Sequence, residues 1–345
     1  MKNLFFLFFL INLSIHAQVI KLKVTENGTN FPVDDADVYF SNSTKNYFTD
    51  LDGVASIDLS QIKSDEFLVV SKKEYDDVKV KVSDLKSLTN VKLSKVSVIE
   101  LNEAVVKNLS VKEIIQKTID NYSKNFNVDQ YYFLANLRQD VKIDSNYYDI
   151  LDVNLQFKFD KEKVKIKSTG KVNDRFIKGF TDVNINFDAS DYLKHLYSYK
   201  NLNTLQKNLA EKKYTNIKSV ITKYADKSMY EVYLDEGEKT KNYLLIDKET
   251  FSVVEYVLTL KNVEETNRAG TLNRNGTISF KYRPYLDGWV LKESDVKYLM
   301  TLSNTYRNKM NIDLDFKIKT FDFSTKTFDK YKRNVNIKSD IRNNF

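Results

Sequence analysis

The sequence contains no cysteine and only two histidines, His16 and His195. Without thiols, disulfides, zinc sites built on cysteine and iron–sulfur clusters are excluded. The lipid-bearing cysteine of a bacterial lipoprotein is also missing, so the chain is not expected to be a lipoprotein. A single histidine beyond residue 17 rules out multi-histidine metal sites and leaves one imidazole for acid–base chemistry. We therefore expect no metal, no cofactor and no catalytic residues.

Long apolar runs are absent after the first residues. The start has one basic residue, Lys2, an apolar stretch from Leu4 to Ile11, and Ser-Ile-His-Ala before Gln18. This pattern is typical of a secretory signal peptide cleaved after Ala17. The run is shorter than the roughly 20 residues that span a bilayer. The sequence predicts export through the inner membrane, to the periplasm, the outer membrane or the exterior, and a mature chain without a transmembrane helix.

The net charge is weakly basic, with 54 Lys and Arg against 47 Asp and Glu. Basic side chains that bind nucleic acid gather on one face. Here they alternate with acids, as in "KFDKEKVKIKS" from residue 158 to 168. We therefore expect no nucleic-acid partner.

The first half of the mature chain, residues 18–106, alternates with a period of two. Ile20, Leu22 and Val24 alternate with Lys21 and Lys23. Similar short runs recur up to residue 93, with turn residues between them. This spacing is typical of a small antiparallel β-sandwich.

Residues 107–127 are expected to form a helix that joins the two halves. Ser110 followed by Glu113 is a capping box. The apolar positions fall on one helical face: Val111, Ile114, Ile115, Thr118, Ile119 and Tyr122.

The second half, residues 128–345, returns to a period of two in longer strands. Leu151, Val153, Leu155 and Phe157 alternate with polar residues. Asp287–Gly288 marks a hairpin, Leu234–Thr240 another turn, and Ser190–Lys212 a helix. We expect a mainly β protein, whose second domain is a large curved antiparallel sheet with one or two packed helices.

The stretch "FTDLDGVASIDL", Phe48 to Leu59, carries two aspartates and a glycine between two strands. As a calcium loop it lacks a carboxylate at its first and twelfth positions, which are Phe48 and Leu59. As a catalytic pair, Asp50 and Asp52 have no base or electrophile beside them in the sequence. The prediction is a turn in which aspartate caps its own backbone and Gly53 takes a positive φ.

This turn lies in a recognisable setting that covers residues 18–106. A Pro–x–x–x–Ala–x–Val strand, a Thr–Asp–x–x–Gly turn, a Tyr-bearing strand and a final Leu–x–Glu–x–Val–Val segment resemble the carboxypeptidase-regulatory-like (transthyretin-like) domain. Two glycines usual in that family are missing, one from the first strand and one at Glu74. The resemblance implies a seven-stranded accessory sandwich without catalytic groups, in an exported bacterial envelope protein. The matching residues are Pro32, Ala36, Val38, Thr49, Asp50, Gly53, Tyr75, Leu101, Glu103, Val105 and Val106.

The second half resembles the incurved half-barrels of periplasmic lipoprotein carriers. The resemblance rests on its long alternating strands and on "LLIDKETFSVVEYVLTL", Leu244 to Leu260. It implies a sheet that curls around a helix, which leaves room for an apolar ligand among the abundant Tyr and Phe side chains.

Two single residues invite a functional interpretation. His195 has Asp191 one helical turn away, but a general base also needs a nucleophile, so a structural histidine is favoured. Trp289 follows the hairpin near Tyr285, where aromatic side chains can stack on sugars. A lone tryptophan at a hairpin more often anchors the core.

Three functions stay open at this point. The favoured one is a non-catalytic envelope protein that binds a partner protein, a glycan or a surface polymer, with ligand-binding residues unknown. The second is a periplasmic carrier of an acyl chain, which requires Leu151, Val153, Leu155 and Phe157 to face a hollow. The third is a small outer-membrane barrel. An enzyme is disfavoured because no set of nucleophile, base and stabiliser can be assembled.

Overall fold

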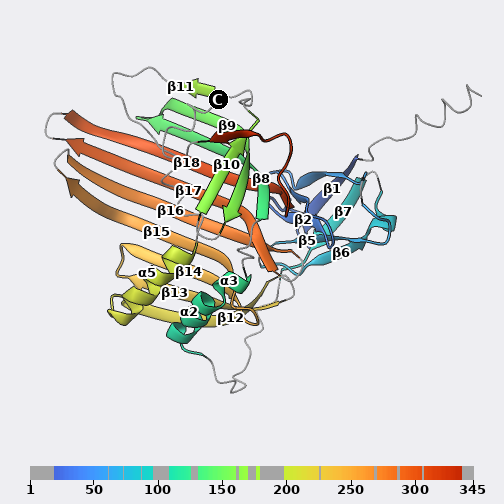
Figure 1. Cartoon of the computed structure of the whole chain (residues 1–345), viewed down its shortest axis with the longest axis horizontal. Coiled ribbons are helices and arrows are strands. Elements are labelled where there is room, and N and C mark those ends of the chain that lie inside the picture. The colour runs from blue at the N-terminus through green and yellow to red at the C-terminus, as the bar shows by residue number, and fades with distance from the viewer. Residues whose placement is uncertain are drawn as a thin grey trace, which may run out of the picture. The chain divides into compact units, whose positions relative to one another are not determined.

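The computed structural model describes residues 19–60, 62–72, 74–86, 88–95, 109–125, 131–160, 163–169, 176–178, 198–224, 227–267, 270–285, 288–304 and 307–335 (Figure 1). The predicted signal peptide lies outside these ranges and stays a prediction. The described chain forms two compact units, one built from the N-terminal strands and one from the elements after residue 109. Among the described residues, no helix is long and apolar enough to cross a lipid bilayer.

The first unit is a sandwich of a three-stranded sheet, ordered β4-β1-β7, and a four-stranded sheet, ordered β3-β2-β5-β6. The number of strands agrees with the prediction. The prediction of a wholly antiparallel sandwich is wrong for one pair of strands, because β7 runs parallel to β1. The chain passes through β5 and β6 of the other sheet before it returns beside β1, and such a crossover permits a parallel pair. The strands are β1 (Val19–Glu26), β2 (Asp37–Phe40), β3 (Asn46–Phe48), β4 (Val54–Asp58), β5 (Phe67–Ser71), β6 (Val78–Lys81) and β7 (Leu88–Leu93), with a 3₁₀ turn η2 (Val82–Asp84).

The core of the sandwich follows from the alternation in the sequence. Ile20, Leu22 and Val24 of β1 are buried, whereas Lys21 and Lys23 between them are exposed. The buried side chains of both sheets form one hydrophobic cluster: Ile20, Leu22, Val24, Val33, Ala36, Val38, Phe40, Ala55, Ile57, Leu68, Val70, Val91 and Leu93.

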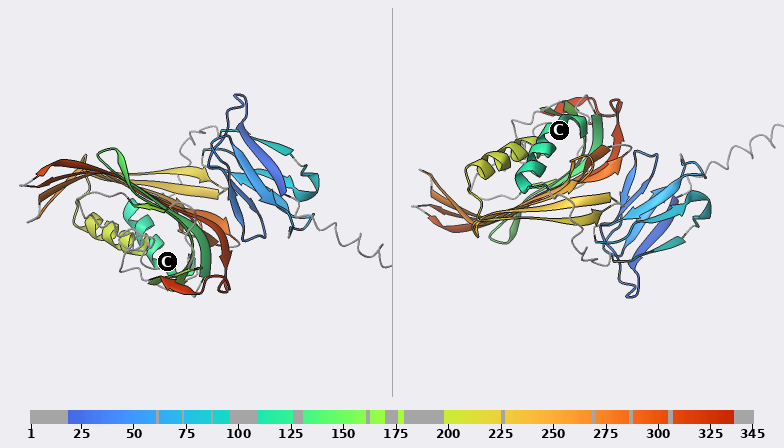
Figure 2. Two further views of the ribbon diagram at one scale, coloured as in Figure 1. Left: turned by 90° about the horizontal axis from the view of Figure 1, so that it is seen from above. Right: turned by 90° about the horizontal axis from the view of Figure 1, so that it is seen from below.

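The second unit is a 12-stranded sheet in which β12, β13, β14, β15, β16, β17, β18, β8, β9, β10 and β19 follow one another, with β11 beside β9. Neighbouring strands from β13 to β19 pair antiparallel. The sheet curves around its helices (Figure 2), as predicted. The strands are β8 (Tyr131–Ile143), β9 (Asn146–Asp160), β10 (Lys163–Ser168), β11 (Phe176–Lys178), β12 (Asn216–Tyr224), β13 (Lys227–Glu236), β14 (Thr240–Asp247), β15 (Val253–Asn267), β16 (Gly270–Tyr285), β17 (Gly288–Asn304), β18 (Arg307–Ser324) and β19 (Arg333–Val335).

The helices of this unit are α2 (Val111–Asp120), α3 (Tyr122–Asn125) and α5 (Ser198–Ala210). The predicted capping box is confirmed, because Glu113 N–H donates to Ser110 Oγ at 3.3 Å and Ser110 N–H donates to Glu113 Oε2 at 2.8 Å. Gln206 Nε2 of α5 donates to Gln116 Oε1 of α2 at 2.9 Å. The helix predicted over 190–212 is confirmed for Ser198–Ala210, and residues 190–197 lie outside the described part.

Candidate functional site

The register of the large sheet places apolar side chains on a single face. Cross-strand partners in an antiparallel pair share a face, and one row runs through Leu258, Ile278, Val296 and Phe316. We call this side the apolar face. Between the register shifts it consists of the even-numbered positions of β13 to β18 and the odd-numbered positions of β8 and β9. The shifts in β9, β15, β17 and β18 change this numbering locally. The other side carries Lys, Asp, Glu, Asn and Thr, and we call it the polar face.

Helices cover one part of the apolar face. Figure 2 shows α2 and α5 lying within the curve of the sheet. Val111, Ile114 and Ile115 of α2 and Leu202 and Leu205 of α5 are buried. At a hydrophobic transfer free energy of about 25 cal/mol per Å², such contacts stabilise the unit by about 2 kcal/mol per large side chain.

The interior beside β9 is filled. Leu151, Val153, Leu155 and Phe157 are each 0% exposed, and the Phe133 and Phe157 rings stack with their centroids 4.8 Å apart. A hollow wide enough for solvent would leave exposed surface on these side chains. The hollow that an acyl carrier was expected to need at these four positions is therefore not there.

Past the described helices, part of the apolar face keeps exposed surface. The far ends of β15 to β18 project past α5 in Figures 1 and 2. The register places Leu272, Leu302 and Met310 toward those ends, and Leu258 and Leu260 in the middle of β15. All five side chains are only partly buried. Leu302 lies opposite both Leu272 and Met310. We call these five residues the exposed apolar end.

The strands beneath this end have a fixed geometry. Gly276 of β16 has φ +156° and lies opposite Tyr298 of β17. Only glycine fits there, because an added Cβ would come within 2.6 Å of Tyr298 Cδ1. Next to it β15 is bulged, and Asn262 N–H, at φ +50°, donates to Asn275 Oδ1 at 2.8 Å. The bulge and the glycine together set the bend of the projecting strands.

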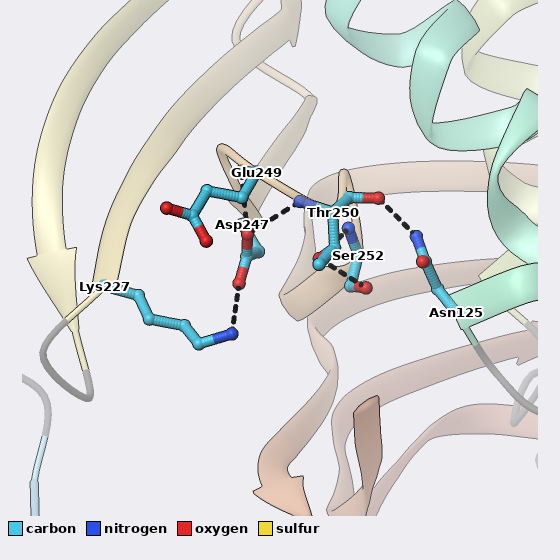
Figure 3. Close-up of polar contacts among 6 residues, drawn as sticks. All are labelled: Asn125, Lys227, Asp247, Glu249, Thr250 and Ser252. Carbon is cyan, nitrogen blue, oxygen red and sulfur yellow. Dashed lines mark hydrogen bonds and ion pairs between the residues drawn. The ribbon is translucent and has the colours of Figure 1, made fainter. Parts of the chain in front are cut away.

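The turn from β14 to β15 holds an ion pair whose carboxylate is fully buried (Figure 3). The Asp247 side chain is 0% exposed and lies 3.2 Å from Lys227 Nζ. Its Oδ1 accepts hydrogen bonds from the N–H groups of Glu249 at 2.8 Å and Thr250 at 2.9 Å. Burial by itself would raise the pKa of Asp247, but the two amides and Lys227 hold it below its ordinary value.

The same turn is attached to the helices. Asn125 Nδ2 at the end of α3 donates to Thr250 O at 2.6 Å. Lys117 of α2 lies 5.3 Å from the centroid of the Phe251 ring, which stacks on Tyr230 of the apolar face. The turn therefore fixes α2 and α3 against the sheet.

The chemistry of this turn is structural. The hydroxyls of Thr250 and Ser252 bond to each other at 2.9 Å, and Asp247 is occupied by three donors. Across the described ranges no group of three or more His, Cys, Asp or Glu residues is placed to hold a metal ion. His195 and Asp191 lie outside those ranges.

The polar face carries charges of both signs. The Glu293 carboxylate, on a residue 2% exposed, lies 2.8 Å from Lys281 Nζ and 3.6 Å from Lys317 Nζ. Burial raises the pKa of Asp315, and the neighbouring Asp295 raises it further. The positive and negative groups alternate on this face as they do in the sequence.

The turn predicted at Asp50–Gly53 can be checked from its own hydrogen bonds. Asp50 Oδ1 accepts from the N–H groups of Asp52 at 3.0 Å and Val54 at 2.8 Å, and Gly53 has φ +71°. The predicted turn is confirmed.

Trp289 is 3% exposed with Lys227 Nζ 5.6 Å from its ring centroid. It anchors the core, and the sugar-stacking alternative for Trp289 is wrong. The exposed apolar end was missed, because its residues alternate like those of the covered core.

Comparisons with known proteins give only distant likenesses. No family model and no curated protein matches the chain, so the carboxypeptidase-regulatory-like resemblance of residues 18–106 has no support there. Among solved structures, the chain is similar to a LolA superfamily protein from Nitrosomonas europaea, with 11% identity, a TM-score of 0.25, and coverage of 64% of this chain and 96% of that one. It is also similar to the MucA/MucB complex of Pseudomonas aeruginosa, with 7% identity, a TM-score of 0.25, and coverage of 63% and 99%.

Proposed function

We propose that this protein is a non-catalytic binding protein of the cell envelope that holds an apolar segment of a partner protein on its exposed apolar end. The observation that carries the proposal is the continuation of the apolar face past the helices. Leu258, Leu260, Leu272, Leu302 and Met310 keep part of their surface in water there. Partly exposed apolar side chains grouped in this way favour a binding site, and the Arg274–Glu265 ion pair beside Leu272 adds a charged border on the same face.

A protein segment fits this surface better than an acyl chain inside the sheet. The interior is filled at Leu151, Val153, Leu155 and Phe157, each 0% exposed. The exposed apolar end is a side-chain surface on long paired strands, next to the bulge in β15 and Gly276. Strands that are already paired in a sheet have less conformational entropy to lose on binding.

The proposal assigns a role to each part of the chain. Residues 1–17 direct export, 18–106 form an accessory sandwich, 107–127 join the two halves, and 128–345 carry the binding surface. N-terminal sequencing of the protein recovered from its host tests the first step, since export with cleavage gives Gln18 as the first residue. A mature chain that begins at Met1 and stays in the cytoplasm would contradict the envelope role.

The test of the binding surface uses two leucines of one strand. Leu302 belongs to the exposed apolar end, whereas Leu299 of β17 is 55% exposed on the polar face. We expect Leu302→Glu to weaken the binding of the apolar dye anilinonaphthalene sulfonate by about tenfold, because it places a carboxylate within the patch. The matched variant Leu299→Glu should leave dye binding unchanged. Equal effects of the two substitutions would refute the proposed site.

A photo-crosslinking residue at position 302 or 299, expressed in the host, identifies the occupant. A protein adduct at 302 that is absent at 299 supports the proposal. A lipid adduct at 302 would favour the carrier instead, and adducts that do not differ between the two positions would end the proposal.

A further inference from the structure

The large sheet ends in an unusually long edge. Strand β12 lies at the end of the strand order and is nine residues long. The other end strands of the described sheets, β3, β4, β6, β7 and β19, have between three and six residues. An end strand leaves one row of backbone N–H and C=O groups without a ladder partner, and short strands are one way in which proteins limit this row. With nine residues, β12 is not shortened in this way.

The side chains of β12 suit pairing with a further strand. Its sequence "NIKSVITKY" contains no proline and is rich in β-branched residues. Ile217 is 50% exposed, and Asn216, Lys218 and Lys223 are exposed as well. On its inner side the chain is held at Thr215, whose N–H donates to Asp235 O at 2.8 Å, and at Asn216, whose Nδ2 donates to Asp235 Oδ2 at 3.0 Å. β12 is therefore held to β13 by these bonds, and among the described strands none pairs with its outer edge.

The lysines on and near β12 favour an acidic partner strand. Lys218 and Lys223 lie on β12, and Lys212 and Lys213 come shortly before it. Glu211 pairs with Lys213 at 2.7 Å. A second copy of β12 would bring two more lysines against this edge, and like charges across a strand pair are destabilising. A strand with carboxylates at matching positions would instead form cross-strand ion pairs.

We propose that β12 binds an acidic, extended peptide segment by strand addition, with Lys218 and Lys223 facing its carboxylates. This site goes beyond the proposed function, because it lies on the edge of the sheet and not on the apolar face. Main-chain hydrogen bonds supply affinity in such a complex, and the side-chain pattern supplies the choice of partner.

The experiment measures the binding of a labelled, end-blocked peptide TVETVTVETV to the full chain by fluorescence polarisation. Its two glutamates are spaced like Lys218 and Lys223. We expect saturable binding that weakens with salt, and a loss of about tenfold when Gln replaces both glutamates. The same peptide with N-methyl groups on alternate amides should not bind, because it can no longer donate to an edge.

Matched variants separate this site from the rest of the molecule. Lys218→Glu with Lys223→Glu should weaken binding by at least about tenfold. The same charge change at Lys79 and Lys81 on the short strand β6 should have no effect, nor should Leu302→Glu. Fluorescence of the buried Trp289 checks the folding of the variants in the second unit, and circular dichroism checks the variant at Lys79 and Lys81. Binding that is unchanged by the β12 substitutions or by N-methylation, no binding up to about 1 mM peptide, or a dimer that β12 substitutions dissolve would each overturn the inference.

Discussion

Two glycines of the second unit share a positive φ but differ in what surrounds them. Gly237, in the turn from β13 to β14, has φ +65° and no atom within 4 Å of an added Cβ. At Gly276, with φ +156°, an added Cβ would lie 2.6 Å from Tyr298 Cδ1, 2.9 Å from Tyr298 Cα, and in contact with the Lys297 carbonyl oxygen. Alanine at the first site therefore meets only a backbone preference, whereas at the second it also meets the main chain of β17.

The magnitudes follow from these surroundings. A left-handed alanine costs about 1–2 kcal/mol, and the loss of glycine freedom in the unfolded chain offsets about 0.5 kcal/mol of that. We expect Gly237→Ala to lower the free energy of unfolding by about 1 kcal/mol. At Gly276 the two strands must also separate, with strained packing and weakened ladder hydrogen bonds, which brings the total to about 4 kcal/mol.

Trp289, the only tryptophan in the chain and 3% exposed, reports this unit alone. With a urea m-value of about 3 kcal/mol per M, the fluorescence midpoint should fall by about 0.3 M for Gly237→Ala and by more than about 1 M for Gly276→Ala. Equal shifts for the two variants would show that Tyr298 and Lys297 do not confine Gly276. The reasoning about the bend beneath the exposed apolar end would then fail.

Three further predictions concern charged and polar groups. Asp50→Asn should change the free energy of unfolding by no more than about 1 kcal/mol, and a melting shift with calcium that this variant abolishes would contradict the turn. The native state holds the pKa of Asp247 below its ordinary value. The ionised Asp247 therefore stabilises the fold above about pH 4, and this stabilisation is lost as the pH falls through the native pKa. Unfolding followed by Trp289 fluorescence should show a smaller loss of stability on acidification for Asp247→Asn than for the wild type. Burial and the bond to Glu231 raise the pKa of Tyr233 to about 12. The stabilisation that the neutral Tyr233 contributes is therefore present below about pH 10 and is lost as the pH rises through about 12. In an alkaline absorbance titration, Tyr233→Phe should lose amplitude near pH 12 and keep its amplitude near pH 10.

Local features of the fold could be predicted from the sequence because their partners are neighbours in the chain. Ser110 and Glu113 are three residues apart and form the capping box. Asp50 and Gly53 form their turn with atoms between residues 50 and 54. The hairpin marked by Asp287–Gly288 is confirmed, because β16 and β17 pair antiparallel and Gly288 pairs with Tyr285. A two-residue turn signal locates a hairpin, but the cross-strand register decides which residues form the loop.

Features set by distant parts of the chain could not be predicted. The parallel pair of β1 and β7 depends on a return from the other sheet of the sandwich. Strand β12 was missed because Val220 and Ile221 are adjacent and interrupt a clean alternation. Glu293, 2% exposed, looks in the sequence like an ordinary surface carboxylate, and only the register places Lys281 and Lys317 around it.

Both proposed binding surfaces belong to this second class, for one physical reason. Alternation tells which side chains share a face, but the same pattern describes Leu155, 0% exposed, and Leu302, partly exposed. What separates them is what packs against each one from elsewhere in the chain, and the sequence of a strand does not specify that. In the same way, the outer row of β12 is available because no described strand follows it in the order. Both proposed surfaces are therefore found where packing or strand pairing ends among the described residues, and not where unusual residue types gather.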